Sequence, residues 1–110
     1  MVKRSSALTT VYAALADPTR RRMLEDLRDG TRTVSELRHP STITLAAVGK
    51  HIAVLEAAGL VRTVKSGRVR SCHLVPGALG EAQKWIEEQN RFWNERLDAL
   101  ADHLQTKDDS

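Results

Sequence analysis

The sequence predicts a mainly α-helical protein with one small β-hairpin. Apolar residues recur at spacings of three and four through most of the 110-residue chain, which is the period of an amphipathic helix. The exception is a stretch around Ser66-Gly67, where strand-forming residues flank a turn. A chain of this length suits a single core. We therefore expect one domain over residues 1–105, followed by a disordered tail at 106–110.

Two helices are expected before Gly30. The first ends near Ala16, and Asp17-Pro18 begins the second, because aspartate caps a helix and proline is tolerated at its first position. The second helix runs to about Arg28, and the glycine that follows stops it. The residues expected to face the core are Leu8, Val11, Tyr12 and Leu15 of the first helix and Met23, Leu24 and Leu27 of the second.

A short helix and a longer one follow. Thr33 and Glu36 have the spacing of a capping box, which predicts a short helix over residues 34–39. Thr44 is the expected N-cap of the next helix, which spans residues 44–58 and stops before a glycine. The residues expected to face the core are Val34 and Leu37 of the short helix and Leu45, Val48, Ile52 and Leu55 of the longer one.

The rest of the chain predicts a hairpin and a long helix. Two strands, at about 60–65 and 69–75, are joined at Ser66-Gly67. The long helix is expected over residues 77–105, because apolar side chains repeat there at helical spacing. In all we expect about five helices and a two-stranded wing, which is the element order of a winged helix-turn-helix.

Charge and cysteine content narrow the classes of function. The net charge is +3, but residues 1–70 carry 13 Lys/Arg against 6 Asp/Glu, whereas residues 71–110 carry 4 against 8. The basic part is therefore the one to test for nucleic acid. The single cysteine, Cys72, excludes an internal disulfide. We expect a cytoplasmic protein, because neither a signal peptide nor an apolar stretch long enough to span a membrane is evident.

The helix at 44–58 has small side chains on the face opposite its apolar stripe. Small residues let a helix approach base edges in the major groove of double-stranded DNA, and a lysine there can reach a guanine or a phosphate. The alternative is an ordinary solvated helix face. The basic hairpin that follows favours the DNA interpretation. The predicted DNA-binding residues are Thr44, Ala46, Ala47, Lys50 and His51 of the helix and Arg62, Lys65, Arg68 and Arg70 of the hairpin at 60–75.

Other chemistry has weaker support. No phosphate-binding loop, nucleophile motif or cofactor fingerprint occurs, so we expect neither an enzyme nor a cofactor. The histidines lack the spacing of a zinc site. Asp98, Asp102 and His103 are best interpreted as a solvated face, and a site between subunits is the alternative. Cys72 could be a redox-sensitive thiol near arginines. We favour the alternative, that it is a small half-buried strand residue. One of the arginines at 20–22 is expected to pair with an acidic neighbour, and the others to be solvated.

Five segments together resemble the ArsR-type winged-helix transcriptional regulators: "ALADPTRRRMLEDL", "TVSEL", "AVGKHIAVLEAAGLV", the turn at Gly67-Arg68, and "WIEEQNRFWNERLDAL". The resemblance covers about residues 8–104 and is greatest to the branch without the cysteine metal-sensor motif, because residues 34–38 contain no cysteine. It implies a cytoplasmic homodimer that represses a promoter by binding an inverted repeat. Two positions depart from the family pattern: Gly49 replaces a usual serine, and Ser41 replaces a bulky apolar residue.

The resemblance also implies that the first and last helices form the dimer interface. Trp85, Phe92 and Trp93 gather on one side of the last helix, and a wide apolar stripe usually marks an interface. An intramolecular core or a ligand pocket is the alternative use of this stripe. Two alternatives for the whole chain are a protein–protein interaction module and a metal-responsive repressor without cysteine ligands. The predicted interface residues are Leu8, Tyr12, Trp85, Phe92, Trp93, Leu97 and Leu100.

Overall fold

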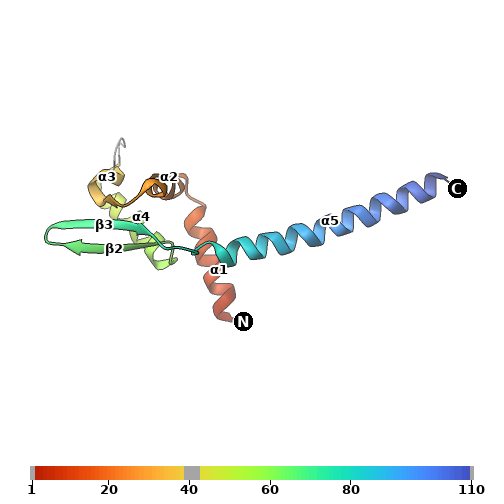
Figure 1. Ribbon diagram of the computed structural model, residues 1–110, viewed down its shortest axis with the longest axis horizontal. Coiled ribbons are helices and arrows are strands. Elements are labelled where there is room, and N and C mark those ends of the chain that lie inside the picture. The colour runs from red at the N-terminus through yellow and green to blue at the C-terminus, as the bar shows by residue number, and fades with distance from the viewer. Residues whose placement is uncertain (1, 39–42, 110) are drawn as a thin grey trace. The chain divides into compact units, whose positions relative to one another are not determined.

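The chain forms two compact units, residues 1–79 and 80–110, in a computed structural model that describes residues 2–38 and 43–109. The first unit holds four α-helices and a small sheet. Figure 1 shows the hairpin of β2 (Val61–Ser66) and β3 (Val69–Leu74) extending away from these helices. The second unit is a single helix, α5 (Gly80–Asp109). The expected mainly α-helical class with a β-hairpin is confirmed. The single domain over residues 1–105 stays a prediction.

The first two helices begin and end close to the predicted positions. Helix α1 spans Val2–Leu15 and α2 spans Pro18–Asp26. Asp17 caps α2 as expected, because its Oδ2 accepts a hydrogen bond from the backbone N–H of Arg20 at 3.0 Å. The expected last turn of α2 tightens into a 3₁₀ turn, η1, at Leu27–Asp29. Gly30 follows with a φ of 140°, which only glycine adopts readily.

The predicted capping box starts α3, which spans Val34–Arg38. The backbone N–H of Thr33 donates to Oε1 of Glu36 at 2.9 Å, and the Glu36 N–H donates to Oγ1 of Thr33 at 3.1 Å. These hydrogen bonds lower the pKa of the Glu36 carboxyl. The predicted end of this helix at residue 39 and the family departure at Ser41 lie outside the described residues.

Helix α4, at Leu45–Ala57, is the centre of the first unit, because it contacts α1, α2, α3 and the sheet. Thr44 caps it through a hydrogen bond from the Ala47 N–H to Oγ1 at 3.1 Å. Three of the four expected core residues, Val48, Ile52 and Leu55, are buried. The prediction for Leu45 was wrong: its side chain is 47% exposed, since at the first turn of the helix it lies beside the hairpin and not under it.

The sheet has three antiparallel strands in the order β1-β3-β2. Strands β2 at Val61–Ser66 and β3 at Val69–Leu74 form the predicted hairpin, with Ser66 opposite Val69. Gly67 opens the two-residue loop with a φ of 62°, as glycine does in type II′ turns. Strand β1, Arg32–Thr33, pairs with β3 and was not predicted. Two residues show no alternation, so the sequence carries no periodic signal for it.

The second unit is α5, which spans Gly80–Asp109. It starts three residues later than predicted, because Gly77 adopts a φ of 73° and residues 75–78 form a turn. It also continues beyond residue 105, so the predicted disordered tail at 106–110 was wrong as far as Asp109. The physical reason is that neither glycine nor proline interrupts the chain after residue 80.

Candidate nucleic-acid interface

The outer face of α4 carries small side chains around one cation. Ala46, Gly49 and Lys50 are exposed, and Ala47 is half-buried. Thr44 is exposed as well, although its hydroxyl oxygen already accepts the helix-capping hydrogen bond. No hydrogen bond or ion pair joins the side chain of Lys50 to another described residue. The predicted face is thus accessible. Among the residues named here only Lys50 has a long side chain, and its ammonium group is free to contact a ligand.

His51 is placed differently from the other predicted DNA-binding residues of α4. Its Nδ1 lies 3.3 Å from Nη1 of Arg20 and 4.0 Å from Oδ2 of Asp17, and its side chain is 23% exposed. The backbone hydrogen bond from Arg20 is the main cause that lowers the pKa of the Asp17 carboxyl. His51 therefore contacts the N-terminal end of α2 and is not simply part of the exposed face.

The four basic residues of the hairpin do not share one face. Lys65 lies opposite Arg70 in the register, so both side chains emerge on the same side of the hairpin. Arg62 lies opposite His73 and is an odd number of residues from Lys65, which puts it on the other side. Arg68 lies in the loop at the tip. Lys65 and Arg70 therefore lie on one side of the hairpin and Arg68 lies at its tip, whereas Arg62 lies on the opposite side.

Glu56 connects α4 to the hairpin, and sequence reasoning missed it. Its Oε2 accepts hydrogen bonds from the backbone N–H and the hydroxyl of Thr63, at 3.1 and 2.9 Å. Nη2 of Arg70 lies 3.9 Å from Oε1 of Glu56 and donates to Oγ1 of Thr63 at 3.2 Å. This cluster holds the hairpin at the end of α4. The charge of Arg70 is partly balanced, so Lys65 and Arg68 are the freer cations.

An open groove with a volume of about 280 Å³ lies between the starts of α3 and α4 and the hairpin. It combines the two chemistries that a DNA strand needs, because guanidinium groups suit phosphates and apolar side chains suit sugars and thymine methyl groups. Leu45 lines this groove, which is where its exposed side chain lies. The lining residues are Thr33, Val34, Ser35, Leu45, Arg68, Val69 and Arg70.

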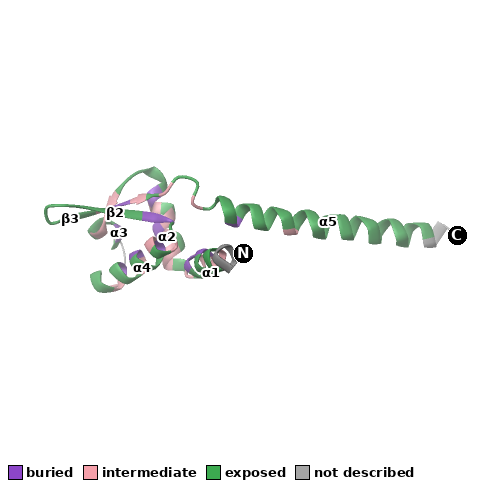
Figure 2. Cartoon of the chain, turned by 90° about the horizontal axis from the view of Figure 1, so that it is seen from below, coloured by how far each residue is buried: buried purple, intermediate pink, exposed green. Residues whose placement is uncertain are grey.

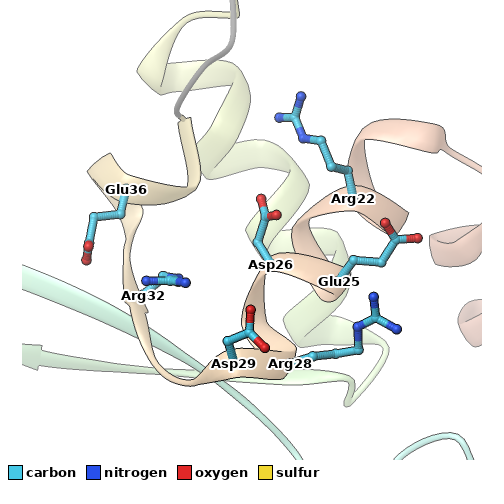
Figure 3. Close-up of a pocket in the computed structure, with 7 residues that line it drawn as sticks. All are labelled: Arg22, Glu25, Asp26, Arg28, Asp29, Arg32 and Glu36. Carbon is cyan, nitrogen blue, oxygen red and sulfur yellow. The ribbon is translucent and has the colours of Figure 1, made fainter.

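A second depression, of about 660 Å³, lies over α2, η1, β1 and α3. Figure 3 shows that its rim mixes charges of both signs. Four carboxylates accompany three guanidinium groups, so this surface does not favour a polyanion such as DNA. The lining residues are Arg22, Glu25, Asp26, Arg28, Asp29, Arg32 and Glu36.

Two of the arginines at 20–22 donate to the end of α1. Arg20 reaches the carbonyls of Ala13 and Ala14, and Arg21 donates to the carbonyl of Leu15 at 2.7 Å. The last carbonyls of a helix lack partners within the helix, so these guanidinium groups act as a C-terminal cap. The prediction that one arginine pairs with an acidic neighbour and the others are solvated was wrong for this pair.

Helix α5 exposes a continuous apolar stripe. Figure 2 shows the helix exposed along most of its length. Phe92 and Trp93 pack edge to face with ring centroids 5.7 Å apart, and the guanidinium of Arg96 lies 5.0 Å from the Phe92 centroid. Of the other predicted interface residues, Leu8 and Tyr12 on α1 are half-buried. The exposed apolar residues of α5 are Trp85, Ile86, Phe92, Trp93, Leu97, Leu100 and Leu104.

Cys72 and the histidines contribute no evident chemistry of their own. Cys72 is buried in β3, and this burial raises the pKa of its thiol, which disfavours the reactive thiolate. His73 lies 2.9 Å from the Thr31 hydroxyl through its Nδ1. Within residues 2–38 and 43–109, His, Cys, Asp and Glu side chains form no group of three that could hold a metal ion. His39 lies outside the described residues.

Gly49 allows a direct test of how closely α4 must approach DNA. A Cβ added at this position meets nothing within 4 Å, so the chain itself does not require glycine here. We expect Gly49→Ala to raise the free energy of unfolding by about 0.5–1 kcal/mol, because alanine favours the helix. If the backbone approaches DNA closely at this point, affinity for DNA falls while stability rises. Unchanged affinity in a titration would show that the glycine is merely tolerated.

No helix among the described residues is long and apolar enough to cross a membrane. A family model described as a helix-turn-helix domain matches residues 15–64, the segment that holds α2, α3 and α4. The HTH-type transcriptional regulator Rv2034 of Mycobacterium tuberculosis is 33% identical over 98 residues, which is 89% of this chain and 89% of that protein.

Solved structures give the same likeness. A crystal structure of an ArsR family transcriptional regulator has a TM-score of 0.78 at 41% identity, covering 82% of this chain and 93% of that one. An ArsR-like transcriptional regulator from Rhodococcus sp. RHA1 has a TM-score of 0.74 at 31% identity, covering 87% of this chain and 91% of that one. Both likenesses extend well beyond the helix-turn-helix segment.

Proposed function

The chain belongs to the ArsR family of winged helix-turn-helix transcriptional regulators, and we propose that it is a homodimeric repressor that binds an inverted-repeat operator. It is a regulator with a DNA-binding domain and not an enzyme. Beyond membership of this family, we propose the dimer, the inverted-repeat form of the operator and the repressive direction of regulation. Its setting is the cytoplasm, where a repressor meets the chromosome.

The observation that carries the proposal is the groove between α4 and the hairpin. Leu45 at the start of α4 lines it together with Arg68 and Arg70 of the hairpin, and the exposed small-residue face with Lys50 belongs to the same helix. In winged-helix proteins the second helix of the motif enters the major groove, and here that helix is α4. We propose that Lys50 reads a base edge and that Lys65 and Arg68 contact phosphates.

A dimer gives this surface its symmetry. Two copies of α4 related by a two-fold axis would enter successive major grooves about 34 Å apart, so the operator is an imperfect palindrome. The exposed stripe of α5, together with α1, supplies the apolar surface that such a dimer needs. Repression is then steric, because the dimer and RNA polymerase compete for one stretch of promoter DNA.

Lys50→Ala tests base reading. We expect this change to weaken binding to an operator fragment by about 1–3 kcal/mol while binding to scrambled DNA changes little. A mobility-shift titration with the DNA upstream of the chain's own coding sequence provides the operator. Equal losses on both fragments would assign Lys50 to a phosphate. A wild-type chain that shifts neither fragment would overturn the proposal and favour a protein–protein interaction module.

Arg68→Ala tests the tip of the hairpin. Loss of one phosphate contact lowers the slope of log affinity against log salt by about one, because fewer counterions are released on binding. The matched control is Arg28→Ala, which removes the same charge from the mixed-charge depression over α2 and η1. We expect the control to keep the wild-type slope. An Arg68→Ala slope equal to that of wild type would remove the hairpin tip from the interface.

A further inference from the structure

We infer that Arg20 is a positioning residue for DNA recognition: its guanidinium, tied to the end of α1, holds His51 and thereby fixes the orientation of α4. This inference rests on the proposed function, because it assigns α4 to the major groove. Arg20 itself is not proposed to touch DNA. Its effect on recognition is transmitted through α4.

The guanidinium of Arg20 joins three helices. Nε donates to the Ala14 carbonyl at 2.8 Å and Nη2 donates to the Ala13 carbonyl at 2.9 Å, both at the end of α1. Nη1 lies 3.3 Å from Nδ1 of His51 on α4. The residue itself belongs to the first turn of α2. All three nitrogens of one planar group are thus engaged, each in a fixed direction.

The chemistry of the contact makes Arg20 the donor. A guanidinium group can only donate hydrogen bonds, so Nδ1 of His51 is the acceptor in a hydrogen bond between the two. The Asp17 carboxylate, 4.0 Å from the same nitrogen, also caps α2 and so is fixed in place. His51 therefore meets a rigid polar junction. The junction restrains rotation of α4 about its own axis.

Rotation of α4 matters because Lys50 precedes His51 directly. Recognition constellations must be held within about 0.5 Å of the productive geometry, so a small turn of this helix moves the ammonium from its base edge. The buried side chains of α4 fix which face points inward, but alkyl contacts are not directional. A directional hydrogen bond at residue 51 supplies the remaining restraint.

Arg21 provides a matched control. It donates to the Leu15 carbonyl at the end of α1, as Arg20 does to Ala13 and Ala14, and among the described residues no hydrogen bond or ion pair joins it to α4. Arg20→Ala and Arg21→Ala therefore both weaken the cap of α1 and both remove one positive charge. Only the first releases His51. The readout is the ratio of affinities for an operator fragment and for scrambled DNA, at a temperature where circular dichroism shows every variant folded.

We expect Arg20→Ala to lower this ratio about tenfold, within the range of coupling between residues in contact. Arg21→Ala should keep the ratio within about twofold of wild type, as expected for a residue without that coupling. His51→Leu should lower the ratio as Arg20→Ala does, and the double variant should be no worse than either single variant. If the two changes act independently, their fold losses in this ratio multiply in the double variant, and that result would overturn the inference.

His51→Asn separates positioning from a direct contact between the ring and DNA. The Oδ1 of asparagine occupies nearly the place of Nδ1 and can accept the hydrogen bond from Arg20, whereas leucine cannot. We expect asparagine to restore most of the ratio that leucine loses. An asparagine variant as poor as the leucine variant would contradict the positioning role.

The wild-type ratio distinguishes the two levels of the account. If wild type does not prefer the operator, the proposed function fails and this inference fails with it. If wild type prefers the operator but Arg20→Ala behaves like Arg21→Ala, the proposed function stands and the positioning role of Arg20 is wrong.

Discussion

Replacing Leu97 with aspartate is expected to split the proposed dimer and to abolish tight binding to the operator. Leu97 is 58% exposed near the middle of the apolar stripe of α5, where a partner helix would cover it. A carboxylate buried there without a partner weakens association by about 3–5 kcal/mol, which is more than a hundredfold. A monomer can place only one α4 helix on an operator that has two half-sites. It therefore loses the binding free energy of the second helix.

Sedimentation equilibrium measures the effect of Leu97→Asp directly. The control is Asn94→Asp, which adds the same charge to α5 outside the stripe. We expect the control to stay dimeric and to bind the operator as wild type does. A Leu97→Asp chain that sediments as a dimer would show that this stripe is not the interface, and would leave a ligand pocket or an intramolecular contact as its use.

Leu55→Ala should have the largest effect on the stability of the first unit. Leu55 is 1% exposed on the inner face of α4, and truncation of a buried leucine costs about 2–5 kcal/mol, because a cavity remains. Small domains are stable by only about 5–15 kcal/mol, so this loss leaves the unit close to unfolding at moderate temperature. Chemical denaturation followed by circular dichroism gives the free energy of unfolding.

Leu45→Ala is the matched control, because it makes the same chemical change on the same helix at an exposed position. We expect a loss of about 1 kcal/mol or less there, in proportion to the smaller area buried. We expect Leu45→Ala to lower DNA affinity more than Leu55→Ala does, since Leu45 lines the groove beside the hairpin. Equal destabilisation by the two changes would mean that Leu45 belongs to the core after all.

Local signals in the sequence predicted most of the helix ends. The caps at Asp17, Thr33 and Thr44 depend on residues within three positions of one another, and each forms the expected hydrogen bond. The hairpin also followed from local alternation and one glycine. By contrast, β1 exists only because β3, which begins at residue 69, supplies its partner. No local pattern encodes that pairing.

The candidate site was less predictable, because it depends on which element each side chain meets. Periodicity placed Leu45 in the core stripe, but it could not show that this side chain lines an open groove beside the hairpin. His51 was expected on the DNA face, whereas it contacts Asp17 and Arg20 from a helix more than 30 residues earlier. The separation of Arg62 from Lys65 could have been predicted, since an odd spacing in a strand changes the face.

Hydroxyl-radical footprinting of the full chain on its operator tests most directly whether two α4 helices are presented at the pitch of DNA. We predict two protected segments related by a two-fold axis, with centres one helical turn or about 34 Å apart, and two chains bound per operator. One protected segment with one chain bound, or a spacing that does not correspond to whole helical turns, would contradict the account.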